Sequence, residues 1–193
     1  MTKSAILLGI VLTAAAADAQ TVLPPNIQIT AAVAPLPEEF RESATVLGYE
    51  TGKTGLQTLR AGKGAFICLA DDPSEDDRFH VACYHKDLEP FMLRGRQLRA
   101  NKITNVDSVR FAEIDAKKLK MPSHPSALYS LTGKPTVFDA ATGVVTGARQ
   151  LYVVYIPFAT SESTGIPAKA APNTPWIMFP GTAKAHIMFV PSM

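Results

Sequence analysis

Short apolar runs alternate along the chain with polar breaks that contain glycine or proline, a pattern more typical of strands than of long helices. The strands that we expect lie at residues 55–60, 65–69, 79–84, 128–131, 136–138, 151–156, 176–179 and 185–190. The first three, with a glycine turn at 61–64, predict a β-meander. Residues 151–156 are apolar on both faces, which predicts a central strand.

Helical spacing of apolar residues occurs in three places. Residues 37–47 begin with a proline and precede a glycine, which are start and stop signals for a helix. A second helix is expected after Asp87, which serves as its cap. Residues 105–120 predict a third helix, although the alternation of Val109 and Phe111 leaves a strand open. Because helices and strands interleave without regular β-α-β order, the sequence predicts a single α+β domain: a mainly antiparallel sheet packed by two or three helices.

The first 19 residues have the three-part layout of a secretory signal peptide. A short basic start is followed by an apolar run at 5–17 and by the A-x-A pattern Ala17-Asp18-Ala19. We expect cleavage between Ala19 and Gln20, and export to the periplasm or the extracellular space. The apolar run is shorter than the roughly 20 residues of a membrane span, and Gln20 provides no thiol for a lipid anchor.

The predicted domain organisation follows from this leader. The signal peptide covers residues 1–19. Three prolines without helical periodicity predict an extended arm over residues 20–36. Residues 37–193 form the α+β domain, and one domain is the expected number for a chain of 193 residues.

The two cysteines lie in neighbouring predicted strands, separated by the acidic, proline-containing turn at 71–77. If these strands pair antiparallel about that turn, residues whose numbers sum to 151 face each other, which places Cys68 opposite Cys83. Exported proteins mature where thiols oxidise, so we expect a disulfide between the two. For a loop of about 15 residues it stabilises the fold by roughly 3 kcal/mol.

A metal site is the alternative use of these cysteines. Cys83 and His85 share a strand face, so Cys68, Cys83 and His85 would form a zinc or copper site if the thiols stayed reduced. Export argues against reduced thiols, and we therefore predict no metal and no cofactor. The acidic turn at 71–77 lacks the spacing of a calcium-binding loop.

Composition and charge narrow the function classes. The net charge of +2 is too small for a dedicated nucleic-acid binder, and a hydrophobic content of 47% excludes a disordered chain.

Three short motifs resemble known catalytic or nucleotide-binding sites but are incomplete. A phosphate-loop-like segment at 48–54 has three residues between its glycines instead of four. Lys53-Thr54-Gly55 lacks the companion motifs of penicillin-recognising enzymes. Ser123-His124-Pro125-Ser126 is no evidence for a catalytic triad, because triads are assembled in space.

Several short motifs together resemble a pattern in uncharacterised secreted bacterial proteins. They are Leu59-Arg60-Ala61-Gly62 and Cys68-Leu69-Ala70-Asp71-Asp72-Pro73, followed by Cys83, a helix and the terminal strand His186-Ile187-Met188. The resemblance covers about half of the mature chain. It implies a bacterial, exported protein with paired cysteines, and it implies no activity.

These observations predict an exported soluble protein that acts as a non-catalytic binding or structural module stabilised by one disulfide. We expect a small-molecule or protein partner, and no nucleic acid, membrane span or lipid anchor. Two alternatives stay open. One is an exported hydrolase-type enzyme with a dispersed active site, which requires a pocket where a histidine meets carboxylates or a hydroxyl. The other is a metal-binding protein that uses Cys68, Cys83 and His85.

Overall fold

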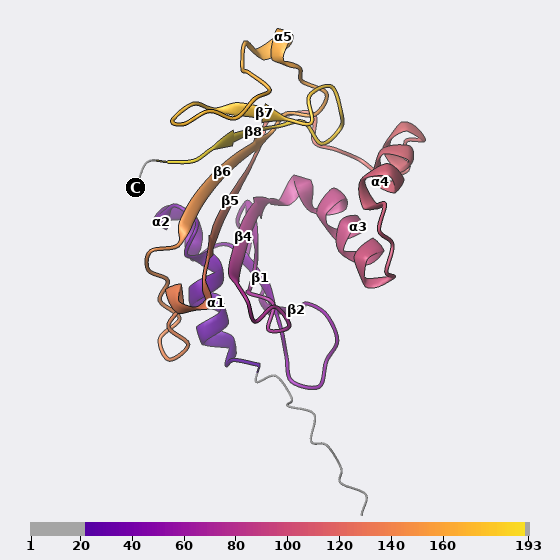
Figure 1. Cartoon of the computed structure of the whole chain (residues 1–193). Coiled ribbons are helices and arrows are strands. Elements are labelled where there is room, and N and C mark those ends of the chain that lie inside the picture. Colours follow the sequence, from indigo (N-terminus) through magenta and orange to yellow (C-terminus); the bar gives the residue numbers. More distant parts are fainter. Residues whose placement is uncertain (1–21, 192–193) are drawn as a thin grey trace, which may run out of the picture.

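One mixed sheet forms the framework of the protein in the computed structural model, which describes residues 22–191 (Figure 1). Its strands are β1 (Thr45–Gly48), β2 (Gln57–Arg60), β3 (Phe66–Leu69), β4 (Phe79–His85), β5 (Ser126–Gly133), β6 (Arg149–Tyr155), β7 (Trp176–Met178) and β8 (His186–Phe189). Across the sheet they follow the order β2-β1-β3-β4-β5-β6-β8-β7. Neighbours pair antiparallel except β1 and β3, which are parallel. This is the α+β single domain that the sequence predicted.

Helices lie on both faces of this sheet. They are α1 (Pro25–Val33), α2 (Glu38–Arg41), α3 (Glu89–Ala100), α4 (Val106–Asp115) and α5 (Ser161–Thr164), with short 3-10 segments at Lys86–Leu88 and Pro135–Val137. Helix α1 packs on one face of the first four strands, and the α3–α4 hairpin lies on the other side (Figure 1).

Helix α1 overturns the extended arm that we predicted for residues 20–36, which was wrong for residues 25–33. Pro25 occupies the first helical turn, where its missing N–H costs nothing. Beyond it, Ala31 and Ala32 are buried against the sheet. A helix of this kind has no amphipathic period, and tertiary burial of small side chains stabilises it. The local sequence pattern therefore could not reveal it.

The predicted helix at 37–47 was also wrong beyond its first turn. Helix α2 ends at Arg41, and the chain then forms β1, where buried and half-buried residues alternate with the period of a strand. Val46 at its centre is 0% exposed. Since β1 lies between β2 and β3, β2 pairs with β1 and not with β3. The predicted meander over 55–85 is therefore interrupted by an earlier strand.

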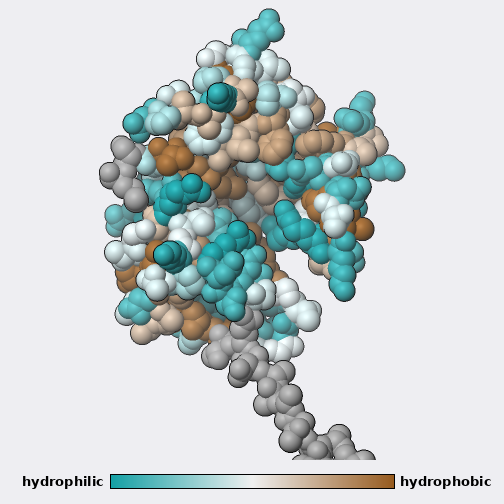
Figure 2. Space-filling view, viewed as in Figure 1, coloured by the Kyte–Doolittle hydropathy of each residue, from teal (hydrophilic) through white to brown (hydrophobic). Residues whose placement is uncertain are grey.

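Helix α3 confirms the helix predicted after Asp87, but Asp87 lies in the preceding 3-10 turn and is not its cap. Helix α4 confirms the helix predicted over 105–120, although it ends at Asp115, and the strand alternative is wrong. The outer surface of this hairpin is largely hydrophilic, with a few exposed apolar side chains such as Leu93 (Figure 2). Its inner surface shares a core with the sheet. The fully or almost fully buried members of that core are Tyr84, Leu88, Phe91, Val153 and Tyr155.

A buried arginine of α4 joins the two helices of the hairpin. Arg110 is 3% exposed, and its guanidinium carbon lies 3.7 Å from the centroid of the Phe91 ring. It pairs with Asp107, whose other carboxylate oxygen accepts a 2.8 Å hydrogen bond from Lys184. Gly95 of α3 leaves room for this group, because a Cβ there would lie 2.8 Å from Arg110 Nη1.

The C-terminal third contains the remaining predicted strands with small shifts at their ends. Strand β6 is central as predicted, since β5 and β8 flank it. The strand predicted at 136–138 was wrong: Pro135–Val137 forms a 3-10 turn, in agreement with the restricted φ of proline, and Phe138 makes one isolated bridge with Val145. The loop at 159–175 contains the short helix α5.

The predicted signal peptide at 1–19, with its cleavage position between Ala19 and Gln20, lies outside the described residues. Within residues 22–191, no helix has both the length and the apolar character that crossing a membrane requires.

Candidate ligand-binding site

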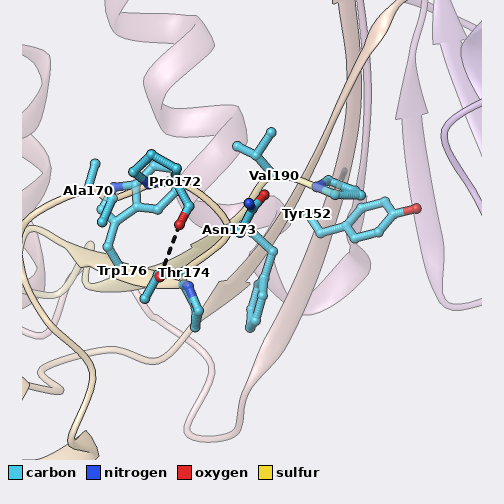
Figure 3. Close-up of a pocket in the computed structure, with 11 residues that line it drawn as sticks. Tyr152, Ala170, Pro172, Asn173, Thr174, Trp176 and Val190 are labelled. Atoms are coloured by element: carbon cyan, nitrogen blue, oxygen red, sulfur yellow. Dashed lines mark hydrogen bonds between the residues drawn. The ribbon is translucent and has the colours of Figure 1, made fainter. Parts of the chain in front are cut away.

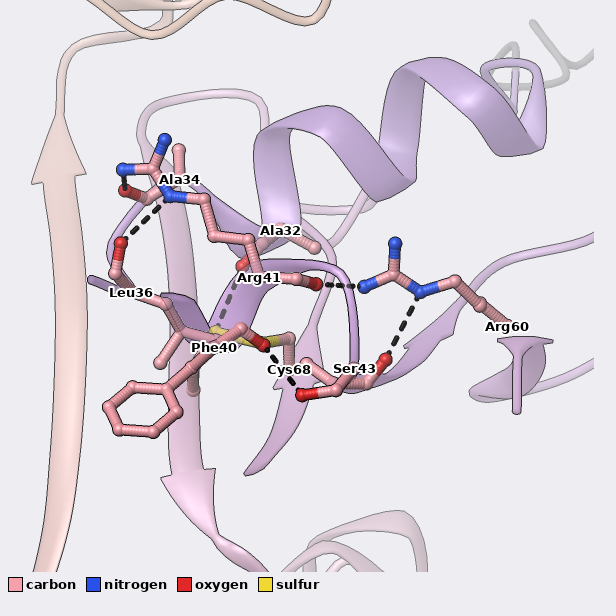
Figure 4. Close-up of a disulfide and its surroundings, with 10 residues drawn as sticks. Ala32, Ala34, Leu36, Phe40, Arg41, Ser43, Arg60 and Cys68 are labelled. Atoms are coloured by element: carbon pink, nitrogen blue, oxygen red, sulfur yellow. Dashed lines mark hydrogen bonds between the residues drawn. A yellow bond between two sulfur atoms is a disulfide. The ribbon is translucent and has the colours of Figure 1, made fainter. Parts of the chain in front are cut away.

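Cys68 and Cys83 form the predicted disulfide between β3 and β4 (Figure 4). The two residues face each other in the strand register, as the sum of their numbers predicted, and both are 0% exposed. The Cys83 sulfur lies 3.1 Å from the Ala32 carbonyl oxygen of α1. A disulfide sulfur carries no hydrogen, so this is a packing contact and not a hydrogen bond. The disulfide therefore joins two central strands directly beneath α1.

This disulfide shows that the metal alternative with Cys68, Cys83 and His85 was wrong. Both sulfurs are bonded to each other, and neither is a thiolate that could bind zinc or copper. His85 does share the face of Cys83, but its ring packs edge-on against Phe66, with 6.0 Å between the ring centroids. In the part of the chain that the structure describes, no group of three or more His, Cys, Asp or Glu side chains is arranged to hold a metal ion.

Two arginines hold the chain around the disulfide (Figure 4). Arg41 donates from Nε to the Leu36 carbonyl at 2.8 Å and from Nη2 to the Ala34 carbonyl at 3.1 Å. Arg60 of β2 donates from Nε to the Ala44 carbonyl at 3.1 Å, and its Nη2 donates to the Arg41 carbonyl. These bonds attach the turns around α2 to the sheet edge, so the strands form a rigid support.

The four histidines do not converge on one pocket. His80 Nδ1 lies 2.8 Å from Thr132 Oγ1, and His186 Nδ1 lies 2.7 Å from a backbone carbonyl oxygen. Burial lowers the pKa of both rings. His85 and His124 are neighbours, with ring centroids 5.7 Å apart. No histidine lines either of the two hollows described below, and this counts against the hydrolase alternative, which requires a histidine in a pocket.

His124 lies between Ser126 and Asp87, in an order that resembles a Ser-His-Asp triad. Its Nε2 is 2.9 Å from Asp87 Oδ2, and its Nδ1 is 3.4 Å from Ser126 Oγ. The hydrogen bonds to the Pro125 carbonyl and to Asp87 raise the pKa of His124. Nδ1, the ring nitrogen nearest Ser126, lies 3.2 Å from the Pro125 carbonyl oxygen, which can only accept, so Nδ1 donates there and cannot accept the serine proton. Ser126 is only 1% exposed, so a substrate cannot reach its hydroxyl. The arrangement is therefore suited to a surface ion pair and not to nucleophilic catalysis.

An aromatic hollow of about 800 Å³ lies between the loop that precedes β7 and the end of β8 (Figure 3). Three aromatic side chains line it: Tyr152 of β6, Trp176 of β7 and Phe189 of β8. The other lining residues are small, apolar or uncharged: Ala170, Ala171, Pro172, Asn173, Thr174, Pro175, Val190 and Pro191. No charged side chain occurs among these described residues.

Strand register explains how the three aromatic residues come together. Tyr152 and Phe189 are directly opposite each other in the β6–β8 ladder, whereas Trp176 is opposite Met188. Residues directly opposite each other in a ladder point to the same face, so Tyr152 and Phe189 share one face of the sheet. Successive residues of a strand point to opposite faces, so Met188 and its partner Trp176 belong to the other face. Trp176 borders the hollow at the sheet edge.

The turn at 170–175 forms the outer wall of the hollow (Figure 3). Asn173 has a φ of 55°, in the left-handed region that asparagine tolerates better than most residues. The Thr174 hydroxyl donates a 3.2 Å hydrogen bond to the Pro172 carbonyl. Further along, the backbone N–H of Ile177 donates to the Pro167 carbonyl at 2.9 Å, so the segment before the turn is attached to β7.

An aromatic row, Phe40, Phe66, Tyr129 and Tyr152, leads away from the hollow on the α1 side of the sheet. The ring centroids of Tyr152 and Tyr129 are 5.5 Å apart, those of Tyr129 and Phe66 are 5.7 Å apart, and those of Phe66 and Phe40 are 5.1 Å apart. Tilted and edge-to-face contacts of this kind hold aromatic rings in fixed orientations. Tyr152 and Tyr129 are half-buried and continue the hollow as a partly exposed surface, whereas Phe66 is buried in the core.

A second, acidic hollow of about 270 Å³ lies beside the N-terminal end of α1 and the turn at 71–77. The stacked rings of Phe79 and Phe138, 5.1 Å apart, form part of its apolar wall. Burial raises the pKa of Asp71 to about 6, although its carboxylate accepts a 2.7 Å hydrogen bond from a backbone N–H of β4. Burial and nearby carboxylates also raise the pKa of Tyr49. Four carboxylates and one arginine line this hollow: Asp71, Asp72, Glu75, Asp76 and Arg78. The excess of negative charge attracts cations and repels anions.

Sequence reasoning did not identify the aromatic hollow. Tyr152, Trp176 and Phe189 belong to three different predicted strands, and nothing in the sequence indicated that these strands are neighbours. One signal was present: the only tryptophan of the chain directly follows the loop of prolines and small residues at 159–175. The acidic turn was noticed, but the apolar side chains that close a hollow behind it come from distant segments.

The comparisons with known proteins add no family to this geometry. No protein-family model matches the chain, and the searches of curated proteins and of solved structures also found no match.

Proposed function

We propose that the protein is an exported, non-catalytic binding module that holds an uncharged ligand in the aromatic hollow. One observation carries the proposal: Tyr152, Trp176 and Phe189 line a hollow of about 800 Å³ whose described lining has no charged side chain. Concave sites of this size, with aromatic walls and a few polar groups, are typical of ligand-binding sites.

The placement of the titratable groups supports binding without turnover. General acid–base catalysis needs a group with a suitable pKa within hydrogen-bond reach of the substrate. Asp71, whose pKa is raised, lines the acidic hollow, and His124 belongs to a surface ion pair. Neither residue lines the aromatic hollow.

The disulfide supports both the rigidity and the export parts of the proposal. A buried disulfide is typical of proteins that mature in an oxidising compartment, in agreement with the leader-like segment at 1–19. Cys83 pairs with Tyr129 in the β4–β5 ladder, and Tyr129 pairs with Tyr152 in the next. The crosslinked strands thus support one wall of the hollow, and a preformed wall lowers the entropy cost of binding.

The binding test uses the indole N–H signal of Trp176, which is unique because the chain has one tryptophan. The ¹⁵N-labelled protein is titrated with uncharged probes: an octaproline peptide, an oligosaccharide and a set of aromatic amides. We expect at least one probe to shift this signal saturably, and the shift to be lost in Tyr152→Leu. If no probe moves the indole signal, the binding proposal is refuted.

Export is tested separately by determining the first residue of the protein recovered from the periplasm of a bacterial host. We expect Gln20. Recovery from the cytosol with Met1 still attached would overturn export and leave the binding result standing.

A further inference from the structure

The aromatic hollow also indicates the chemistry of its ligand. Resting on the proposed function, we infer that this ligand is a proline-rich peptide segment in the extended polyproline II conformation. Such segments present apolar rings and backbone carbonyls, and their prolines carry no N–H. Their recognition in aromatic-lined grooves is a general mode of peptide binding.

Charge is the first argument. The described lining of the hollow has no Lys, Arg, Asp or Glu side chain, so it offers no counter-charge to an ionic ligand. Placing an unpaired charge against this apolar wall would cost desolvation energy without compensation. A proline-rich segment without charged residues avoids that cost.

Hydrogen-bonding capacity is the second argument. Four lining side chains carry polar hydrogens, those of Tyr152, Asn173, Thr174 and Trp176, and the Thr174 hydroxyl already donates to a backbone carbonyl. The remaining three can all donate, and the indole N–H can only donate. A sugar presents a hydroxyl on most ring carbons and needs many more partners, whereas a proline-rich peptide needs donors alone.

The state of the sheet edge is the third argument. Ile177 is the middle residue of β7, and its outward N–H already donates to the Pro167 carbonyl at 2.9 Å. The chain's own proline-containing segment therefore occupies the place where a peptide strand would be added. A peptide ligand at this site must be held by side-chain contacts, which is how polyproline II segments are recognised.

Shape is the fourth argument. The half-buried ring of Tyr129 continues the hollow beyond Tyr152, with ring centroids 5.5 Å apart, and the row then enters the core at Phe66, which is 6% exposed. Phe189, directly opposite Tyr152 in the β6–β8 ladder, extends the aromatic lining in the other direction. An elongated lining of this kind fits an extended peptide better than a compact small molecule.

The experiment compares octaproline with a Gly-Ser peptide of the same length and with an uncharged oligosaccharide, using the indole signal of Trp176. We expect octaproline alone to shift the signal saturably. Its affinity should fall at least about tenfold in Tyr152→Leu and in Phe189→Leu, because each removes an aromatic wall. The matched control is Phe158→Leu, which removes an aromatic ring that is 55% exposed and does not line the hollow. This control should bind as the unmodified protein does.

The outcomes separate this inference from the proposed function. If the oligosaccharide shifts the indole signal and octaproline does not, the ligand class is wrong and the binding module stands. If octaproline binds equally well to Tyr152→Leu and Phe189→Leu, it binds elsewhere and the inference falls. A strong salt dependence between about 50 and 500 mM would also contradict it, because binding of an uncharged ligand is not screened.

Discussion

Loss of the disulfide is the perturbation whose cost follows most directly from the structure. Cys68 and Cys83 are separated by 15 residues, and a crosslink closing a loop of that length is worth about 3 kcal/mol in chain entropy. Both sulfurs are fully buried beneath α1. Replacing both cysteines with alanine also empties the space of two sulfur atoms, at about 1 kcal/mol for each methyl-sized void. The expected total is about 5 kcal/mol.

The assay is urea unfolding, followed by the fluorescence of Trp176, on three samples. These are the oxidised protein, the same protein in reductant, and the double variant Cys68→Ala/Cys83→Ala. Reduction removes the crosslink but keeps both sulfurs, so it isolates the entropy part. With a urea slope of about 2 kcal/mol/M, the midpoint should fall by about 1.5 M on reduction and about 2.5 M in the double variant.

The control is the double variant in reductant, whose midpoint should not move. Equal midpoints for the oxidised and reduced protein would refute the entropy argument. A double variant as stable as the reduced protein would show that the two sulfurs do not contribute through packing.

Three further predictions concern other parts of the fold. Gly62→Ala should destabilise the protein by about 2–3 kcal/mol, measured by urea unfolding, because its Cβ would lie 2.3 Å from the Ser43 carbonyl oxygen; an unchanged midpoint would contradict this. Asp71→Asn should make the protein more stable than the original at pH 7.5 and equally stable near pH 4, since the folded-state pKa of Asp71 is raised to about 6 and its charge destabilises the fold above that pH. A stability difference independent of pH would show that this carboxylate is not responsible. Asp107→Asn should lower the free energy of unfolding by about 3 kcal/mol, measured by thermal or urea unfolding, because it leaves the buried Arg110 guanidinium without its counter-ion and weakens the Lys184 contact. The control Lys184→Met keeps the Arg110–Asp107 pair and should cost clearly less.

Local patterns were sufficient where a short turn connects the interacting parts. The β3–β4 hairpin was predicted down to the pairing of Cys68 with Cys83, because a turn between adjacent strands sets their register. Helix α3 was predicted because its buried residues recur at helical spacing. Helix α4 was predicted from the helical spacing of apolar residues, although its buried residue is Arg110. In each case the information lies within about 20 residues of sequence.

Local patterns failed where distant segments decide the structure. Residues 25–33 have no helical period, and they become a helix because the sheet buries Ala31 and Ala32. The sequence pattern of residues 45–48 predicted the end of a helix. The segment instead forms β1, because β2 and β3 supply hydrogen-bonding partners on both sides. Propensity is a weak preference that such tertiary contacts override.

By itself, the sequence determined the α+β class, the disulfide with its register, and the lack of a complete catalytic motif. Only the tertiary structure decided that Tyr152, Trp176 and Phe189 meet around one hollow, and that His124 is held in an ion pair beside a buried serine. The physical reason is that sheet order is set by which strands can bury their faces together. The order of the strands depends on the whole chain, so it cannot be predicted from the spacing in the sequence of the residues that it brings together.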